Sequence, residues 1–174
     1  MLETLWFIRA WFQWFGLVVL VIVSFRRGAA PERWLSSILL GMIGFDFAYH
    51  GIFGQPGIVI DRGNIGHFLN DLWVMAAIFV VAMRANRVYP LWLGAAQIIA
   101  VLAHCYRFAF TDIDMLAYAI MQRMPSWIQL VVMTIGLTAH IRRERAIGPY
   151  PSWEALARVV PPVLRAGSPL PTRI

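Results

Sequence analysis

The chain has 174 residues, of which 60% are hydrophobic and 14% are charged, and its formal net charge is +6. Soluble domains average about 45–50% apolar and about 25% charged residues, so this composition excludes an ordinary soluble protein and predicts an integral membrane protein. A mostly apolar chain of this length has room for one helical bundle and for no separate soluble catalytic domain.

Five apolar runs approach the roughly 20 residues that a membrane-spanning helix needs. They are Leu5–Phe25, Trp34–Ile52, Gly66–Met83, Leu91–Phe110 and Leu116–Ile141. The first lacks a basic start and exceeds the length of a signal-peptide core, so we interpret it as a helix. Pro125 interrupts the fifth, which is either one kinked helix or a short helix followed by a short span. We predict an all-α transmembrane bundle over residues 1–145 and a Pro- and Gly-rich tail over residues 146–174.

Arginine residues gather in alternate connections between these runs. Arg26, Arg27 and Arg33 lie between runs one and two, Arg84 and Arg87 lie between runs three and four, and several more follow run five. Cytoplasmic loops retain positive charge, so this alternation predicts five spans, with the N-terminus outside and the C-terminus in the cytoplasm. The positive charge is then a signal of membrane topology, and we expect lipid as a partner and no nucleic acid.

Polar residues interrupt the apolar runs near the ends that this topology places outside. Asp46 and His50 are four residues apart, as are His67 and Asp71, so each pair shares one helix face. At the same level lie Arg9, Gln13, Asn70, His104 and Arg107, and Gln97 shares the helix face of the last two. Such residues are costly in a bilayer, usually face the bundle interior and often mark functional sites.

The first of three hypotheses for these residues is structural. Arg9 and Arg107 would neutralise Asp46 and Asp71, and a network completed by polar neighbours would fix how the helices pack. Those neighbours are Gln13, Asn70 and Gln97.

The second hypothesis is a metal or haem site. Metal ligands would be His50, His67, Asp46 and Asp71, a set that suits Zn, Fe, Mn or Cu. Two histidines on different helices can instead ligate a haem iron, and His104 is a further candidate for cofactor binding. Ala100 precedes His104 by four residues, a spacing also found where a helix histidine ligates bacteriochlorophyll, so pigment contact is a related hypothesis. The sequence contains no HExxH motif and no Glu-x-x-His pair.

The third hypothesis is a pathway for protons or ions that enters through Asp46, Asp71 and the histidines. In the inner half of the bundle, Gln97 and Gln129 are the evident polar steps that would continue such a path.

Three segments resemble a known group of proteins: "HFLNDLW", "MRANRVYPLW" and "GPYPSW". The stretch from the first to the last, half of the chain, is similar to small uncharacterised inner-membrane proteins of alphaproteobacteria. The N-terminal helix lies outside the similarity. The resemblance implies a location in the bacterial inner membrane and implies no activity, no cofactor and no site residue.

Among functions, the sequence favours a non-catalytic accessory or assembly subunit of a larger respiratory or photosynthetic membrane complex, or a homo-oligomer. Phe7, Trp11, Trp14 and Phe15 form a bulky stripe on the first helix that suits packing against another subunit or lipid. No catalytic signature or nucleotide-binding motif is evident. The alternatives are a metal- or haem-binding redox protein and a proton or ion pathway.

Overall fold

The computed structural model describes residues 2–53, 60–109 and 115–153, except for the side chains of residues 2–10, 53, 60–64, 115–119 and 122. It contains α1 (Leu2–Arg27), α2 (Ala30–Phe53), α3 (Ile60–Arg84), α4 (Tyr89–Ala109) and α5 (Met115–Ile147). The all-α prediction is confirmed, and the described residues include no strand. Helix α5 runs through Pro125 without a break, so the fifth apolar run forms one helix.

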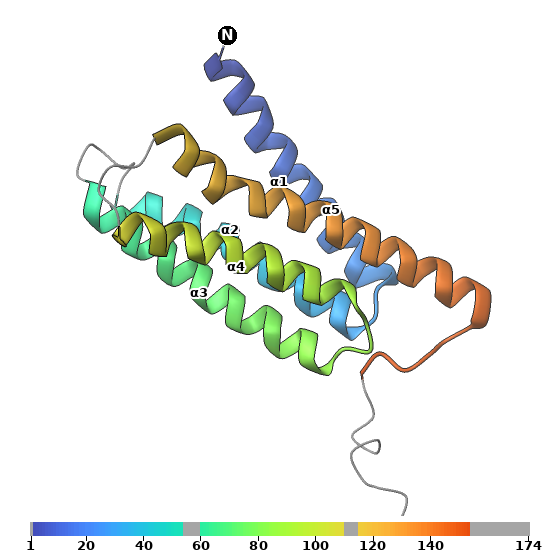
Figure 1. Ribbon diagram of the computed structural model, residues 1–174. Coiled ribbons are helices and arrows are strands. Elements are labelled where there is room, and N and C mark those ends of the chain that lie inside the picture. The colour runs from blue at the N-terminus through green and yellow to red at the C-terminus, as the bar shows by residue number, and fades with distance from the viewer. Residues whose placement is uncertain (1, 54–59, 110–114, 154–174) are drawn as a thin grey trace, which may run out of the picture.

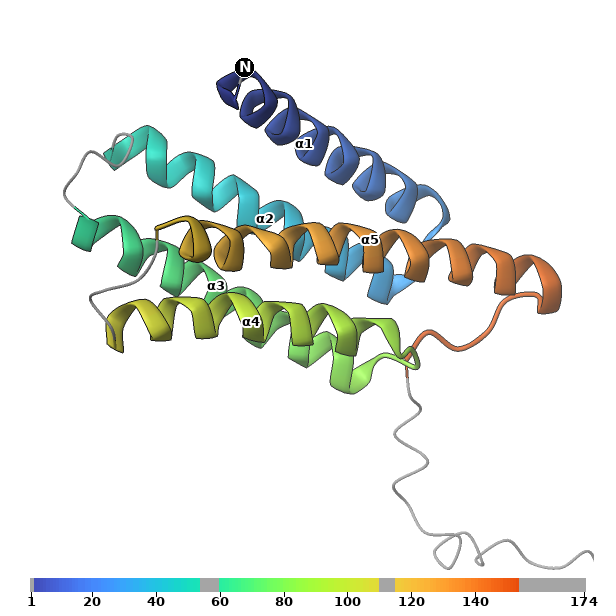
Figure 2. The ribbon, with the colours of Figure 1, turned by 45° about the horizontal axis from the view of Figure 1, so that its top comes forward.

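The five helices run up and down, each packing against the next one along the chain, and α5 also contacts α1 (Figure 1). In Figure 2 the N-terminal end of α1 stands apart from the other four helices. We call one end of the bundle the arginine end, because the last turns of α1, α3 and α5 carry Arg27, Arg84 and Arg145 there. The opposite end, where α2 and α4 finish, is the histidine end.

Four described helices are long and apolar enough to cross a membrane. The qualifying segments are Ala30–Ile52, Ile65–Arg84, Tyr89–Ala109 and Arg123–Ile147. These segments support a multi-pass membrane protein. The crossing by α1 and the orientation of the termini stay predictions.

An apolar layer separates the two ends of the bundle. Leu35, Ile78, Leu93 and Met133, from α2, α3, α4 and α5, are each 0% exposed, and Leu17 of α1 joins the same cluster. Dense packing of these side chains positions the polar residues above and below them.

Local sequence explains the sharp connections at the arginine end. Pro31 lies in the first turn of α2, where no helical N–H bond is lost, and Glu32 Oε2 accepts a 3.1 Å bond from the Ala29 backbone N–H. Helix α5 finishes before Gly148, whose φ of 78° lets the chain turn back toward the bundle. That return brings Trp153 beside Ala85, and the Asn86 N–H donates to the Ser152 carbonyl at 3.2 Å.

Candidate metal centre

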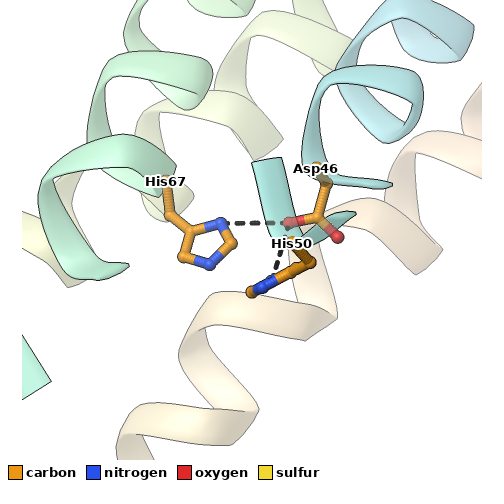
Figure 3. Close-up of side chains that lie close together, drawn as sticks. All are labelled: Asp46, His50 and His67. Atoms are coloured by element: carbon orange, nitrogen blue, oxygen red, sulfur yellow. Dashed lines mark ion pairs between the residues drawn. The ribbon is translucent and has the colours of Figure 1, made fainter. Parts of the chain in front are cut away.

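Two helices bring Asp46, His50 and His67 together at the histidine end. Asp46 and His50 lie one turn apart on α2, and His67 faces them from α3 (Figure 3). The Asp46 carboxylate oxygen Oδ1 lies 3.1 Å from His67 Nδ1 and 3.6 Å from His50 Nε2. The i, i+4 spacing on α2 therefore supplies two donors, and the packing of α2 against α3 supplies the third.

The spacing of these three atoms suits one metal ion. The donor atoms of Asp46, His50 and His67 all lie within 4.8 Å of one another. Ligand atoms at about 2.0–2.1 Å from a tetrahedral zinc ion are about 3.3 Å apart, between the two distances measured to Asp46 Oδ1. Two imidazoles and one carboxylate are also the donors that iron and manganese use in open three-ligand sites.

The cluster is open to its surroundings. The Asp46 side chain is 47% exposed, while those of His50 and His67 are 20% and 21% exposed. An ion therefore has access to the carboxylate, and three protein ligands leave coordination positions for water or another molecule. A haem held between His50 and His67 fits less well. Axial ligands lie on opposite faces of a flat macrocycle, whereas these two imidazoles meet at one carboxylate oxygen.

Asp71 lies outside this group and forms a separate polar chain with α4 and α5. One carboxylate oxygen, Oδ2, is 3.1 Å from His104 Nε2, and the other, Oδ1, accepts a 2.9 Å bond from Gln97 Nε2. Gln97 Oε1 in turn accepts a 2.6 Å bond from Gln129 Nε2. His104, Gln97 and Gln129 are all at most 1% exposed, so this chain binds three helices together in the core.

Asp71 sets the direction of the hydrogen bonds that run from it through Gln97 to Gln129. Its carboxylate needs donors, which turns the Gln97 amino group toward it and the Gln97 oxygen toward Gln129. The Gln129 amino group is thereby used, and its Oε1 has no hydrogen-bond partner among the described residues. These connected side chains lie toward the histidine end, and the apolar layer of Leu35, Ile78, Leu93 and Met133 lies beyond them, so the proton-pathway hypothesis stays a prediction.

The other residues of the hypothesised polar network are placed as follows. Asn70 is buried and joins α3 to α2, since its Nδ2 donates to the Met42 carbonyl at 3.1 Å and its Oδ1 accepts from Trp73 Nε1 at 2.9 Å. Gln13 and Arg107 are half-buried. The side chain of Arg9 lies outside the described residues, so neutralisation of the aspartates by Arg9 and Arg107 stays a prediction. The ion pairs that the structure gives Asp46 and Asp71 are with histidines.

A second charged cluster, which the sequence analysis did not identify, lies at the arginine end. Glu32 of α2 is 0% exposed and pairs with Arg87, whose Nε lies 3.1 Å from Glu32 Oε1. Tyr89 also donates to that oxygen at 3.3 Å. Because Glu32 stands in the first turn of a helix beside arginines, its sequence context resembles that of a solvated helix cap.

The same cluster fastens the segment that follows α5. His140 Nδ1 lies 3.2 Å from the Arg87 guanidinium and 2.8 Å from the Tyr150 hydroxyl. The Tyr150 ring is held between Arg87 and Arg143, whose Cζ atoms are 4.4 and 4.5 Å from its centroid. Burial raises the pKa of the Tyr150 hydroxyl, and Arg87 and Arg143 oppose that rise. Arg87 is therefore shared by Glu32 and the returning chain.

Comparison of the chain with protein-family models, with curated proteins and with solved structures finds no match.

Proposed function

We propose that this chain is a multi-pass membrane protein that binds a divalent transition-metal ion through Asp46, His50 and His67. The observation that carries the proposal is the convergence of three donor atoms, from two helices, within 4.8 Å. The set of two nitrogens and one oxygen suits Zn²⁺, Fe²⁺ or Mn²⁺. With three protein ligands, the ion keeps open positions at which it can hold water or a second molecule.

The metal proposal is tested on the full chain purified in mild detergent. Elemental analysis and Zn²⁺ titration should give one bound ion per chain for the wild type. His50→Ala and His67→Ala should each weaken Zn²⁺ binding at least 100-fold. His140→Gln, which removes a histidine at the arginine end, is the matched control and should bind like the wild type. Equal Zn²⁺ binding by His67→Ala and His140→Gln would contradict the proposal.

The proposed topology has five spans in a bacterial inner membrane, with the N-terminus outside and the C-terminus cytoplasmic. The concentration of arginine at one end of the bundle supports it. On this topology the proposed metal centre faces the outside. Cys105 is the only cysteine, so single-cysteine variants in a Cys105→Ser background report sidedness. A membrane-impermeant maleimide added to intact cells should label Gly51→Cys and leave Ser152→Cys unlabelled, and the reverse pattern would overturn the orientation.

A second candidate function is that of an accessory or assembly subunit, and helix α1 favours it. Trp14 packs against Phe47 of α2 at 6.3 Å between ring centroids, whereas Trp11 and Phe15 are 64% and 70% exposed. This exposed aromatic face stands on the helix that diverges from the bundle, where a neighbouring subunit can contact it as well as lipid can. A photo-crosslinking residue at Phe15 should capture a membrane protein that the same residue at Val80, an exposed position of α3, does not. Equal capture from both positions would remove this support.

A further inference from the structure

Tyr49 lies against both candidate histidine ligands. Its ring centroid is 5.8 Å from that of His50, with the planes near perpendicular, and 5.8 Å from that of His67. The two imidazoles are 5.1 Å apart, so the three rings form a compact triangle. Phe45 stacks on Tyr49 at 6.2 Å with an interplanar angle of 18°. The Tyr49 ring is therefore restrained on several sides by other rings.

Gly66, the residue before His67, provides the surface on which this ring rests. A Cβ atom built at Gly66 would lie 2.6 Å from Cε2 and Cζ of Tyr49 and 3.0 Å from its hydroxyl oxygen. These distances are far shorter than van der Waals contact. The tyrosine ring thus lies directly on the α3 backbone, and only glycine permits so close an approach.

This contact sets the distance on which the metal centre depends. Asp46 and His50 belong to α2 while His67 belongs to α3, so the distance between their donor atoms follows the separation of the two helices at this level. A bound metal accepts ligand distances only within about 0.2 Å of its preferred values. A ring wedged between α2 and the α3 backbone, and touching both imidazoles, holds that separation.

We propose that Tyr49, seated on Gly66, is the positioning residue of the Asp46, His50 and His67 metal centre. This inference rests on the proposed metal-binding function. Tyr49 contacts the two imidazoles through its ring, so the proposal assigns the positioning role to the ring. Residues that orient metal ligands typically change metal affinity by about 10–100-fold when they are replaced.

The test uses Co²⁺ titration of the full chain in detergent, because the visible absorption of bound Co²⁺ reports coordination geometry as well as affinity. Gly66→Ala should weaken Co²⁺ binding at least tenfold and change the shape of its spectrum, since the added methyl displaces the ring from between the imidazoles. Gly44→Ala is the matched control: it makes the same change on α2, where a new Cβ meets no atom within 4 Å. It should bind Co²⁺ like the wild type.

Two variants of Tyr49 itself make the test independent of the folding of Gly66→Ala. Tyr49→Leu removes the ring without overlap and should weaken Co²⁺ binding at least tenfold, with a melting temperature close to that of the wild type. Tyr49→Phe keeps the ring and should restore both affinity and spectrum.

The outcomes separate the two proposals. The wild type could bind Co²⁺ while Tyr49→Leu and Gly66→Ala bind it with the same affinity and the same spectrum. That result would overturn the positioning role and retain the metal centre. Absence of Co²⁺ binding by the wild type would remove the proposed function itself, and the positioning role with it.

Discussion

The two ends of the bundle carry charged clusters built in similar ways, yet they differ in burial and in the partners of their carboxylates. At each end a tyrosine ring lies on a glycine of a neighbouring helix: Tyr49 on Gly66 at the histidine end, and Tyr89 on Gly136 at the arginine end. Glu32 is fully buried and accepts bonds from Arg87, Tyr89 and its own helix start. Asp46 is 47% exposed and faces two histidines.

This difference is the basis for interpreting the cluster at the arginine end as structural and for proposing the one at the histidine end as a ligand-binding site. A buried carboxylate with an arginine and further donors has the full set of partners that burial demands, so it fastens helices together. A half-exposed carboxylate beside two imidazoles contributes little free energy of folding through those contacts, and its oxygen lone pairs stay accessible to an ion. The buried ion pair at the arginine end is thus a structural cluster separate from the network that the sequence suggests near the outside.

The largest expected effect is on the stability of the arginine end. Arg87→Met leaves the Glu32 charge buried without its ion-pair partner, and should lower the free energy of unfolding by about 3–5 kcal/mol. Adding Glu32→Leu should recover most of that loss, because the pair is then replaced by apolar side chains. Denaturant unfolding in mixed micelles measures both variants. A loss in Arg87→Met no greater than that in Asp46→Asn would contradict the contrast between the two ends.

The buried pair of Asp71 and His104 should show an intermediate effect. His104→Leu removes one of the described side-chain groups that contact the Asp71 carboxylate and should cost about 1–3 kcal/mol of stability. Cys105→Ala, at the next position on α4, is the control because Cys105 is exposed, and it should be neutral. If the two variants have the same melting temperature, the hydrogen-bonded side chains from His104 to Gln129 contribute little to the stability of the fold.

Substitutions in the candidate metal centre should affect stability least among the charged clusters. Asp46→Asn removes a half-exposed charge whose ion pairs are worth at most about 1 kcal/mol, so metal-free protein should unfold almost like the wild type. The same variant should lose Zn²⁺ binding. A loss of several kcal/mol in metal-free Asp46→Asn would assign the cluster a structural role instead.

The smallest effect concerns the returning segment at the arginine end and depends on pH. Burial raises the pKa of Tyr150, so the docked segment favours the neutral hydroxyl. That contribution to docking is complete below the ordinary tyrosine pKa of about 10 and is lost as pH rises through the raised pKa. A spin label at Ser152→Cys, in a Cys105→Ser background, should become more mobile above about pH 10. The same pH dependence in Tyr150→Phe would show that another group is responsible.

The length of the apolar runs made the helices predictable from the sequence. Four of the five apolar runs fall within single helices, and the remaining one, Leu91–Phe110, lies within α4 except for Phe110, which is outside the described residues. Helix ends and run ends also differ at the caps: α2 starts earlier than its apolar run, at Pro31 and Glu32, and α5 continues past Ile141 and ends before Gly148. The sequence could not decide between one continuous helix through Pro125 and two shorter helices, because proline is tolerated or disruptive according to its neighbours. Of the predicted tail, residues 148–153 return to the bundle, and the residues beyond Trp153 lie outside the described part of the chain.

The residues of the candidate site were predictable from the sequence, but which of them contact one another was not. Spacing placed Asp46 with His50 and His67 with Asp71, yet His67 faces Asp46 while Asp71 faces His104. That division depends on how α3 is rotated about its axis between α2 and α4. Residue spacing within a single helix does not fix this rotation. The sequence does not single out Glu32 and His140, because each lies near arginines at a helix end, where charged side chains are common.

X-ray absorption at the zinc edge tests the central claim most directly. The Zn²⁺-loaded protein should show two imidazole nitrogens and one or more oxygens at about 2.0–2.1 Å, and His67→Ala should lose one imidazole. A shell of oxygens alone, or a spectrum unchanged in His67→Ala, would contradict the assignment of Asp46, His50 and His67 as a metal centre.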